Sequence, residues 1–140
     1  MAKFPEPPPA AELAAVAPEI RILEAGTRLW RIYFRGGLHP TFWDTFRSFG
    51  PTRNRFDHHL PPPRTQERSI FYGALAGSTC LAEVFQQTRV IDRTVSGPWL
   101  VGFDLRESLE LLDLTGTWPT RAGASMTIAS GPRPRAQRWS

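Results

Sequence analysis

The sequence predicts a small mixed α/β domain of the α+β kind, with a sheet of few strands and flanking helices. Short segments rich in aromatic and β-branched residues alternate with segments of helical spacing, and Gly- and Pro-rich stretches separate them. A chain of 140 residues suffices for one compact domain. The apolar share of 41% and the charged share of 21% are typical of a folded globular protein.

The first 26 residues differ in composition from the rest. Residues 4–9 read Phe-Pro-Glu-Pro-Pro-Pro, and because proline has no amide donor this segment predicts an extended leader. The alanine-rich residues 10–17 predict a short helix that ends before Pro18. We therefore expect a leader with a short helix over residues 1–26 and a single domain over residues 27–140.

Residues 27–34, Thr-Arg-Leu-Trp-Arg-Ile-Tyr-Phe, predict the first strand of the domain. The period of two places Arg31 on one face with Leu29 and Tyr33, so that an arginine is embedded in an apolar strand. Residues 38–66 carry many Pro, Asp, Asn and His residues and predict a long loop with brief structure at 42–49. Long ordered loops in small domains often carry function.

Further elements are expected toward the C-terminus. Residues 69–75 predict a second strand, and Gly77-Ser78-Thr79 predicts the start of a helix that runs to about Thr88. Glu83 lies beside the apolar stripe of this helix. The remaining expected elements are strands over 98–105 and 109–114, a helix over 120–129, a turn at Gly131-Pro132 and the first turns of a helix over 133–140.

Composition limits the classes of function. No apolar run approaches the roughly 20 residues that cross a bilayer, and the start of the chain lacks signal-peptide features, so we expect a cytoplasmic protein. The single cysteine, Cys80, cannot form an internal disulfide and lies in a context typical of packing. His58 and His59 are adjacent, and no further cluster completes a zinc-like set, so no metal is expected. The formal charge of +4 favours anionic partners.

Four segments resemble the RES family of bacterial toxins, which is named for an arginine, a glutamate and a serine. They are Trp30-Arg31-Ile32-Tyr33, then Thr-Arg-Asn-Arg-Phe-Asp at 52–57, Ile-Phe-Tyr-Gly-Ala at 70–74 and Cys-Leu-Ala-Glu-Val-Phe at 80–85. Their order and spacing are more specific than any one of them. Residues 101–105 and 111–115 are similar to the family's paired strands, and the resemblance covers roughly residues 28–140.

The sequence departs from the family at the third signature residue. In relatives the serine follows a helix that here begins near residues 136–139, and Ser125, Ser130 and Ser140 lie in no matching context. No serine is carried over, and we expect the chain to lack the C-terminal part of the family domain.

The resemblance implies a fold similar to the ADP-ribosyltransferases and cleavage of the bond between nicotinamide and ribose in NAD. NAD is then a substrate, and no other cofactor is implied; the chain also has no Walker loop and no strand-flanked GxGxxG. The implied role is that of a toxin whose partner is a helix-turn-helix (Xre-type) antitoxin. Membrane or direct nucleic-acid binding is not expected. The acceptor of the ADP-ribose (water, phosphate or a protein) and the oligomeric state stay open.

The resemblance assigns catalytic roles to Glu83 and Arg31. Nicotinamide leaves as a neutral group, so one carboxylate can suffice, and Glu83 would stabilise the oxocarbenium-like transition state. Arg31 would bind the pyrophosphate, which a planar guanidinium matches well. The alternatives are a solvated helix glutamate for Glu83, and an exposed strand arginine or an ion pair with a loop carboxylate for Arg31.

Two further residues are assigned to substrate binding. Arg55 would contact a second phosphate or the ribose, with Arg53 and Arg64 as alternatives. Tyr72 would stack on nicotinamide or ribose, with Tyr33 as its alternative, and core packing is an alternative for both tyrosines.

Two rival functions remain open. Arg133, Arg135 and Arg138 favour a basic RNA-binding or RNA-cleaving module, although no RNA-recognition signature occurs. A catalytically inactive, antitoxin-binding fragment is the second rival.

Overall fold

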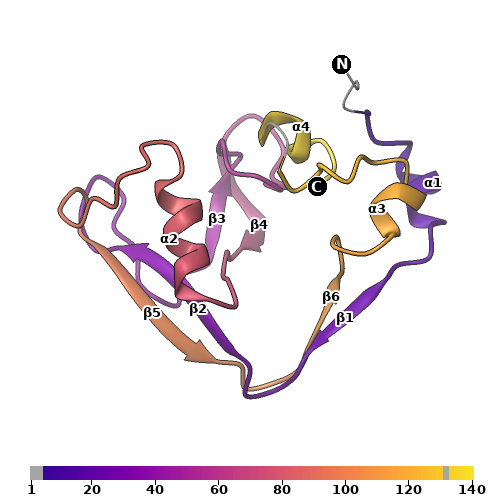
Figure 1. The fold of residues 1–140 in the computed structure, drawn as a ribbon. Helices are drawn as coiled ribbons and strands as arrows, with labels where there is room; N and C mark the ends of the chain where they lie inside the picture. The colour runs from indigo at the N-terminus through magenta and orange to yellow at the C-terminus, as the bar shows by residue number, and fades with distance from the viewer. Residues whose placement is uncertain (1–4, 131–132) are drawn as a thin grey trace. The chain divides into compact units, whose positions relative to one another are not determined.

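The computed structural model describes residues 5–130 and 133–140 and shows a mixed α/β chain with small sheets, which confirms the predicted class (Figure 1). The strands pair as β1–β6, β2–β5 and β3–β4. The helices are α1 (Ala10–Ala14), α2 (Gly77–Phe85), α3 (Trp118–Arg121) and α4 (Arg133–Gln137). The strands are β1 (Ile20–Leu23), β2 (Arg28–Phe34), β3 (Arg47–Gly50), β4 (Arg64–Ile70), β5 (Pro98–Asp104) and β6 (Leu109–Leu112). Likeness to the ADP-ribosyltransferase fold stays a prediction.

The chain folds into two compact units, and each unit is assembled from separate stretches of sequence. The first unit comprises Met1–Ile22, Ser48–Arg68 and Glu110–Ser140. The second unit comprises Leu23–Arg47 and Ser69–Leu109. The expected division into a leader over residues 1–26 and one domain over residues 27–140 remains a prediction.

The second unit is built on the antiparallel ribbon of β2 and β5, in which Arg28 pairs with Asp104 and Phe34 with Pro98. Directly paired residues share a face, so the predicted face of Leu29, Arg31 and Tyr33 is completed by Phe103, Val101 and Trp99. We call this the Arg31 face. The opposite face carries Trp30 and Ile32 with their partners Gly102 and Leu100, and we call it the Trp30 face.

Helix α2 packs on the Trp30 face (Figure 1). A Cβ atom added to Gly77 would lie 3.2 Å from Leu100 Cδ2 and 3.7 Å from the Trp30 ring. One added to Gly102 would meet the same ring at 3.0 Å. The buried Cys80 thiol donates to the Trp30 carbonyl at 3.1 Å. The two glycines therefore make room for the indole between helix and ribbon.

Several elements differ in extent from the prediction. The strand expected at 69–75 ends at Ile70 and extends back to Arg64, because pairing with β3 outweighs its polar composition. Beyond it, Ala74 forms an isolated bridge to Trp30. Helix α2 ends at Phe85, before Thr88. The helix expected at 120–129 is a single turn, α3, which ends before Gly123, a glycine with φ of +86°.

The other elements lie close to their expected positions, although β1 within the leader was not predicted. The predicted short helix of residues 10–17 is α1, and the two late strands are β5 and β6. The predicted turn at residues 131 and 132 lies outside the described residues. No helix in the described part of the chain combines the length and hydropathy that crossing a bilayer requires.

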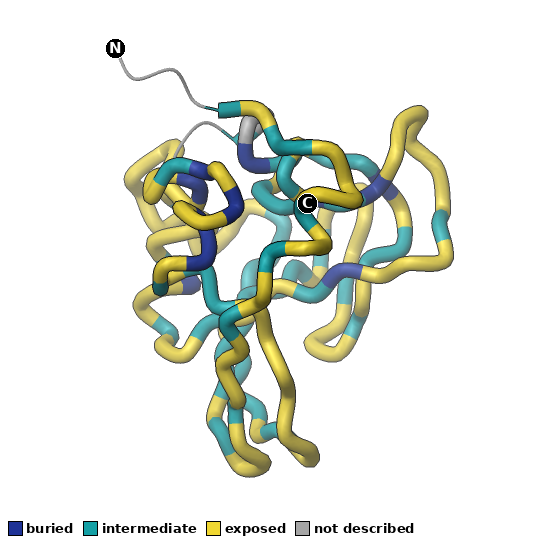
Figure 2. The backbone as a smooth tube through the Cα atoms, turned by 90° about the vertical axis from the view of Figure 1, so that its right-hand side faces the viewer, coloured by how far each residue is buried: buried dark blue, intermediate teal, exposed yellow. Residues whose placement is uncertain are grey.

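The first unit has a small core. Ala124 and Ile128 are buried, and the partly buried rings of Phe56 and Trp139 pack against them. Buried stretches are short and separated along the chain (Figure 2). Much of the stability of this unit must therefore come from polar contacts within its loops as well as from apolar burial.

Candidate functional site

Arg31 is held on its face of the ribbon by neutral groups. Its Nη1 donates to the carbonyl of Trp43 at 3.0 Å and to that of Thr45 at 2.6 Å. Its guanidinium carbon lies 4.3 Å from the centroid of the Phe71 ring, a cation–π distance. These contacts fix the guanidinium without neutralising its charge.

A tight turn in the predicted long loop presents those carbonyls. Thr41 N donates to Phe34 O at 2.7 Å, which returns the chain to the end of β2. Within the turn, Phe42 N donates to Thr45 Oγ1 at 3.0 Å and Thr45 N to Phe42 O at 3.2 Å. The brief structure expected at 42–49 is thus a turn followed by β3.

The electrostatics of Arg31 favour an anionic ligand. Partial burial lowers the pKa of Arg31, and the nearby Asp44 carboxylate opposes this effect. The guanidinium nevertheless stays cationic at neutral pH. Across residues 5–130 and 133–140, no carboxylate pairs with it and its Nε and Nη2 groups donate no hydrogen bond. The expected alternative of an ion pair with a loop carboxylate is therefore not what the structure shows.

Further aromatic rings pack next to Phe71, the ring that contacts this arginine. Phe71 packs edge-on against Phe103 with centroids 5.5 Å apart, and Phe46 lies 4.9 Å from Phe71. Trp43 lies 6.1 Å from Phe103. Trp43 and Phe46 remain 47% and 61% exposed. The arrangement joins a cation to exposed aromatic surface.

Glu83 lies elsewhere in the second unit. It is an exposed residue of α2, the helix that packs on the Trp30 face. In the described residues, no hydrogen bond or ion pair involves its carboxylate. Arg31 therefore projects from one face of the ribbon while Glu83 belongs to the helix on the other face, so the structure does not bring these two assigned residues into one cleft. The cause is the space at Gly77 and Gly102, which seats α2 over the Trp30 indole.

The two tyrosines differ in exposure. Tyr72 is 43% exposed and follows Phe71, the ring beneath the Arg31 guanidinium. Tyr33 is half-buried on the Arg31 face, paired with Trp99. Tyr72 is thus the more accessible of the two for a ligand, as the sequence analysis assigned it.

Arg55 belongs to the first unit. Its Nη1 donates to the carbonyl of Ala129, which ties the predicted long loop to the segment after α3. Of its alternatives, Arg53 is exposed. Arg64 donates from Nη1 to the carbonyls of Leu60 and Pro62, both at 3.2 Å. The structure therefore gives Arg55 and Arg64 contacts within their own loop regions.

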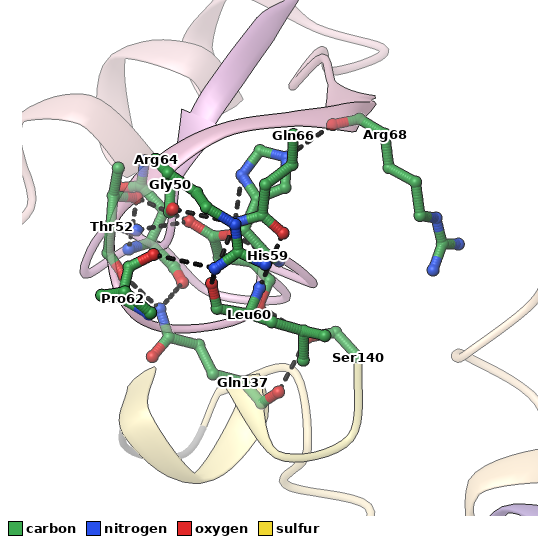
Figure 3. Close-up of polar contacts among 12 residues, drawn as sticks. Gly50, Thr52, His59, Leu60, Pro62, Arg64, Gln66, Arg68, Gln137 and Ser140 are labelled. Atoms are coloured by element: carbon green, nitrogen blue, oxygen red, sulfur yellow. Dashed lines mark hydrogen bonds and ion pairs between the residues drawn. The ribbon is translucent and has the colours of Figure 1, made fainter.

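Sequence reasoning missed a buried polar node in the first unit (Figure 3). Asp57 and His59 are 3% and 4% exposed. The Asp57 Oδ2 accepts from Thr52 N at 2.7 Å and Thr52 Oγ1 at 2.9 Å, while Oδ1 accepts from His59 N at 3.0 Å. His59 Nε2 donates to Arg68 O at 2.6 Å, since a carbonyl can only accept. The sequence did carry a signal for this node: Thr52, Asp57 and His59 are close in sequence, and an Asp side chain often accepts from backbone N–H groups a few residues away.

This node borders a pocket of about 610 Å³. Two of its polar lining residues are engaged within the unit: Gln137 Nε2 donates to Thr52 O at 2.6 Å, and Ser140 Oγ to Asp57 O at 3.0 Å. The Arg68 side chain, whose backbone carbonyl accepts from His59, directs its guanidinium away from that histidine (Figure 3). Within the described ranges, no group of three His, Cys, Asp or Glu residues is placed to hold a metal ion. The node is best explained as a loop-stabilising element.

Comparison with known proteins adds one finding. Neither the curated proteins nor the solved structures gave a significant match. The family model described as the RES domain matches residues 28–140, a range that includes Arg31, Arg55, Tyr72 and Glu83. Since that range is most of the sequence, the chain belongs to the RES domain family.

Proposed function

We propose that this protein is an NAD-cleaving toxin that breaks the bond between nicotinamide and ribose. The observation that carries the proposal is the RES domain match over residues 28–140, within which Arg31 and Glu83 stand in the motifs resembling the family's arginine and glutamate. The presentation of Arg31 supports it, because a half-buried cation with unused donors suits a phosphate ligand.

Arg31 would bind the pyrophosphate of NAD. Its Nη1 is occupied by two carbonyls, so Nε and Nη2 form the edge that meets phosphate oxygens. Phe71 beneath the guanidinium keeps water from one side of it and so strengthens the contact. Tyr72, exposed beside Phe71, would contact nicotinamide or ribose.

Glu83 would act on the ribose. As the bond between C1′ and nitrogen breaks, its electron pair leaves with nicotinamide, and positive charge develops on the ribose ring. The Glu83 carboxylate would stabilise that charge until a nucleophile adds to C1′. Because Arg31 and Glu83 lie on opposite faces of the ribbon, the proposal requires NAD binding to bring both groups to one ligand.

The proposal extends to the biological setting that family membership implies. The toxin would act in the cytoplasm, where NAD is its substrate and where an Xre-type antitoxin would bind and silence it. Co-purification of a tagged, catalytically impaired chain with the product of a neighbouring helix-turn-helix gene would test that partnership.

The central experiment is the Glu83→Gln substitution, followed by NAD concentration over time with purified protein. Glutamine keeps the size of the side chain but removes its charge, so the loss falls on the cationic transition state. We expect a rate at least about a hundredfold lower, equivalent to roughly 3 kcal/mol. Glu107→Gln is the matched control, because Glu107 is also exposed in the second unit and loses the same charge.

Circular dichroism must show that both variants fold. Normal turnover by a folded Glu83→Gln protein, or equal losses in the Glu83 and Glu107 variants, would contradict the proposed mechanism.

A further inference from the structure

Trp43 contacts Arg31 through its backbone carbonyl, and the residue is 47% exposed. We propose that Trp43 and Arg31 together form a nucleotide-recognition surface, in which the indole stacks on a planar ring of the ligand while the guanidinium binds its phosphate. The identity of that ligand as NAD rests on the proposed function. The surface itself rests on the contacts of Arg31 with the Trp43 carbonyl and the Phe71 ring.

The position of Trp43 is fixed by the same contact that holds Arg31. The Trp43 carbonyl accepts from Arg31 Nη1 at 3.0 Å, and the turn closed by Thr45 keeps this carbonyl in place. The indole is supported on one side by Phe103, at 6.1 Å and an interplanar angle of 47°. Almost half of Trp43 is nevertheless solvent-exposed, at 47%. A ring that is anchored and exposed is preorganised for stacking.

A second arginine and tryptophan in the same unit, Arg35 and Trp99, differ from Arg31 and Trp43 in which ring the cation covers. Arg35 lies over Trp99, with its guanidinium carbon 4.8 Å from the ring, so that the cation covers the indole. Arg31 instead lies over Phe71. Among the residues that the structure describes, no cation lies over the Trp43 ring. Trp43 therefore keeps a ring that no cation covers, and its backbone is held by an arginine that has unused donors.

The charge balance favours a ligand with both a ring and a phosphate. Asp44, next to Trp43, acts on Arg31 and reduces the net positive potential of this surface. An anion without a ring gains only the guanidinium contact. A nucleotide adds ring stacking, which is commonly large enough to change affinity by about tenfold or more for each base.

The test measures binding by isothermal titration calorimetry with NAD, AMP and inorganic pyrophosphate. Trp43→Leu keeps apolar bulk but removes the aromatic ring, and we expect it to weaken NAD and AMP binding by about tenfold while leaving pyrophosphate unchanged. Trp43→Phe should retain most of the affinity. Trp99→Leu is the matched control, because Trp99 is similarly exposed at 52% but is covered by Arg35.

The outcomes separate this inference from the proposed function. Unchanged NAD and AMP affinity in a folded Trp43→Leu protein overturns the inference, even where the wild type cleaves NAD. Loss of AMP affinity in that variant, together with a wild type that does not consume NAD, supports the inference and contradicts the proposed function. A wild type that binds neither nucleotide overturns the inference.

Discussion

Replacing Asp57 by asparagine tests whether the buried node of the first unit stabilises the protein. The carboxylate uses both oxygens: Oδ2 accepts from the backbone and hydroxyl of Thr52, and Oδ1 accepts from the backbone of His59. Asparagine has one carbonyl oxygen and one NH2 group in the same space. If the oxygen faces Thr52, the NH2 group faces the N–H of His59, and two donors oppose each other.

The magnitude follows from these contacts. Two bonds to Thr52 would survive without the help of a full charge, at a cost of about 0.5–1 kcal/mol each, and the N–H of His59 would lose its acceptor in a buried site, at about 1–3 kcal/mol. We therefore expect Asp57→Asn to lower the free energy of unfolding by roughly 2–5 kcal/mol, a large part of the stability of a small protein.

Asp92 offers a matched control in the second unit. A single oxygen, Oδ1, accepts from Thr94 N at 2.8 Å, Thr94 Oγ1 at 2.7 Å and Val95 N at 3.1 Å. Hydrogen bonds from Thr94 lower the pKa of Asp92, but the carboxylate is solvent-exposed. The carbonyl of asparagine can replace that one oxygen, and water can solvate the other group. Because solvent screens the charge at this exposed site, Asp92→Asn should lower the free energy of unfolding by clearly less than Asp57→Asn.

Urea unfolding followed by circular dichroism measures both variants. A lower midpoint at an unchanged slope would report lost stability rather than a change in the denatured state. A loss below about 0.5 kcal/mol in Asp57→Asn, or equal losses in the two variants, would refute the argument that burial makes this node important.

Two further predictions concern the second unit. Arg31→Lys keeps the positive charge but loses the paired donors, so steady-state kinetics should show a raised KM for NAD with residual turnover at high NAD. An unchanged KM would contradict pyrophosphate binding by Arg31. Arg93→Lys, at an exposed position, is the control. Burial raises the pKa of the Cys80 thiol, which therefore carries less of the reactive thiolate near pH 8 than a free cysteine. Iodoacetamide should label Cys80 at least about tenfold more slowly in the native protein than in urea, and equal rates would show that the thiol is accessible.

The unequal success of the sequence predictions has a physical pattern. β2 and β5 were predicted well because runs of aromatic and β-branched residues encode both the strand and its alternation of faces. β4 was predicted too late along the chain because its residues Arg64–Ile70 are mostly polar, and its strand conformation depends on pairing with β3. The helix expected at 120–129 failed because Gly123 adopts a positive φ immediately after α3.

The site shows the same division between local and distant information. Local periodicity places Arg31 on the face of Leu29 and Tyr33, and the RES domain match shows the family to which these motifs belong. The contact between Arg31 and Trp43 required the loop to fold back on β2. The spacing of residues in the sequence does not predict that this loop folds back onto β2.

The family, the mixed α/β class and the side of its strand from which Arg31 projects can therefore be read from the sequence. In contrast, the packing of α2 on the other side, which separates Glu83 from Arg31, and the burial of Asp57 in a loop are seen only in the folded chain. A strand's period of two is a property of adjacent residues, whereas the face that a helix covers depends on the space left by distant ones. Here that space is the absence of side chains at Gly77 and Gly102, into which the Trp30 ring fits.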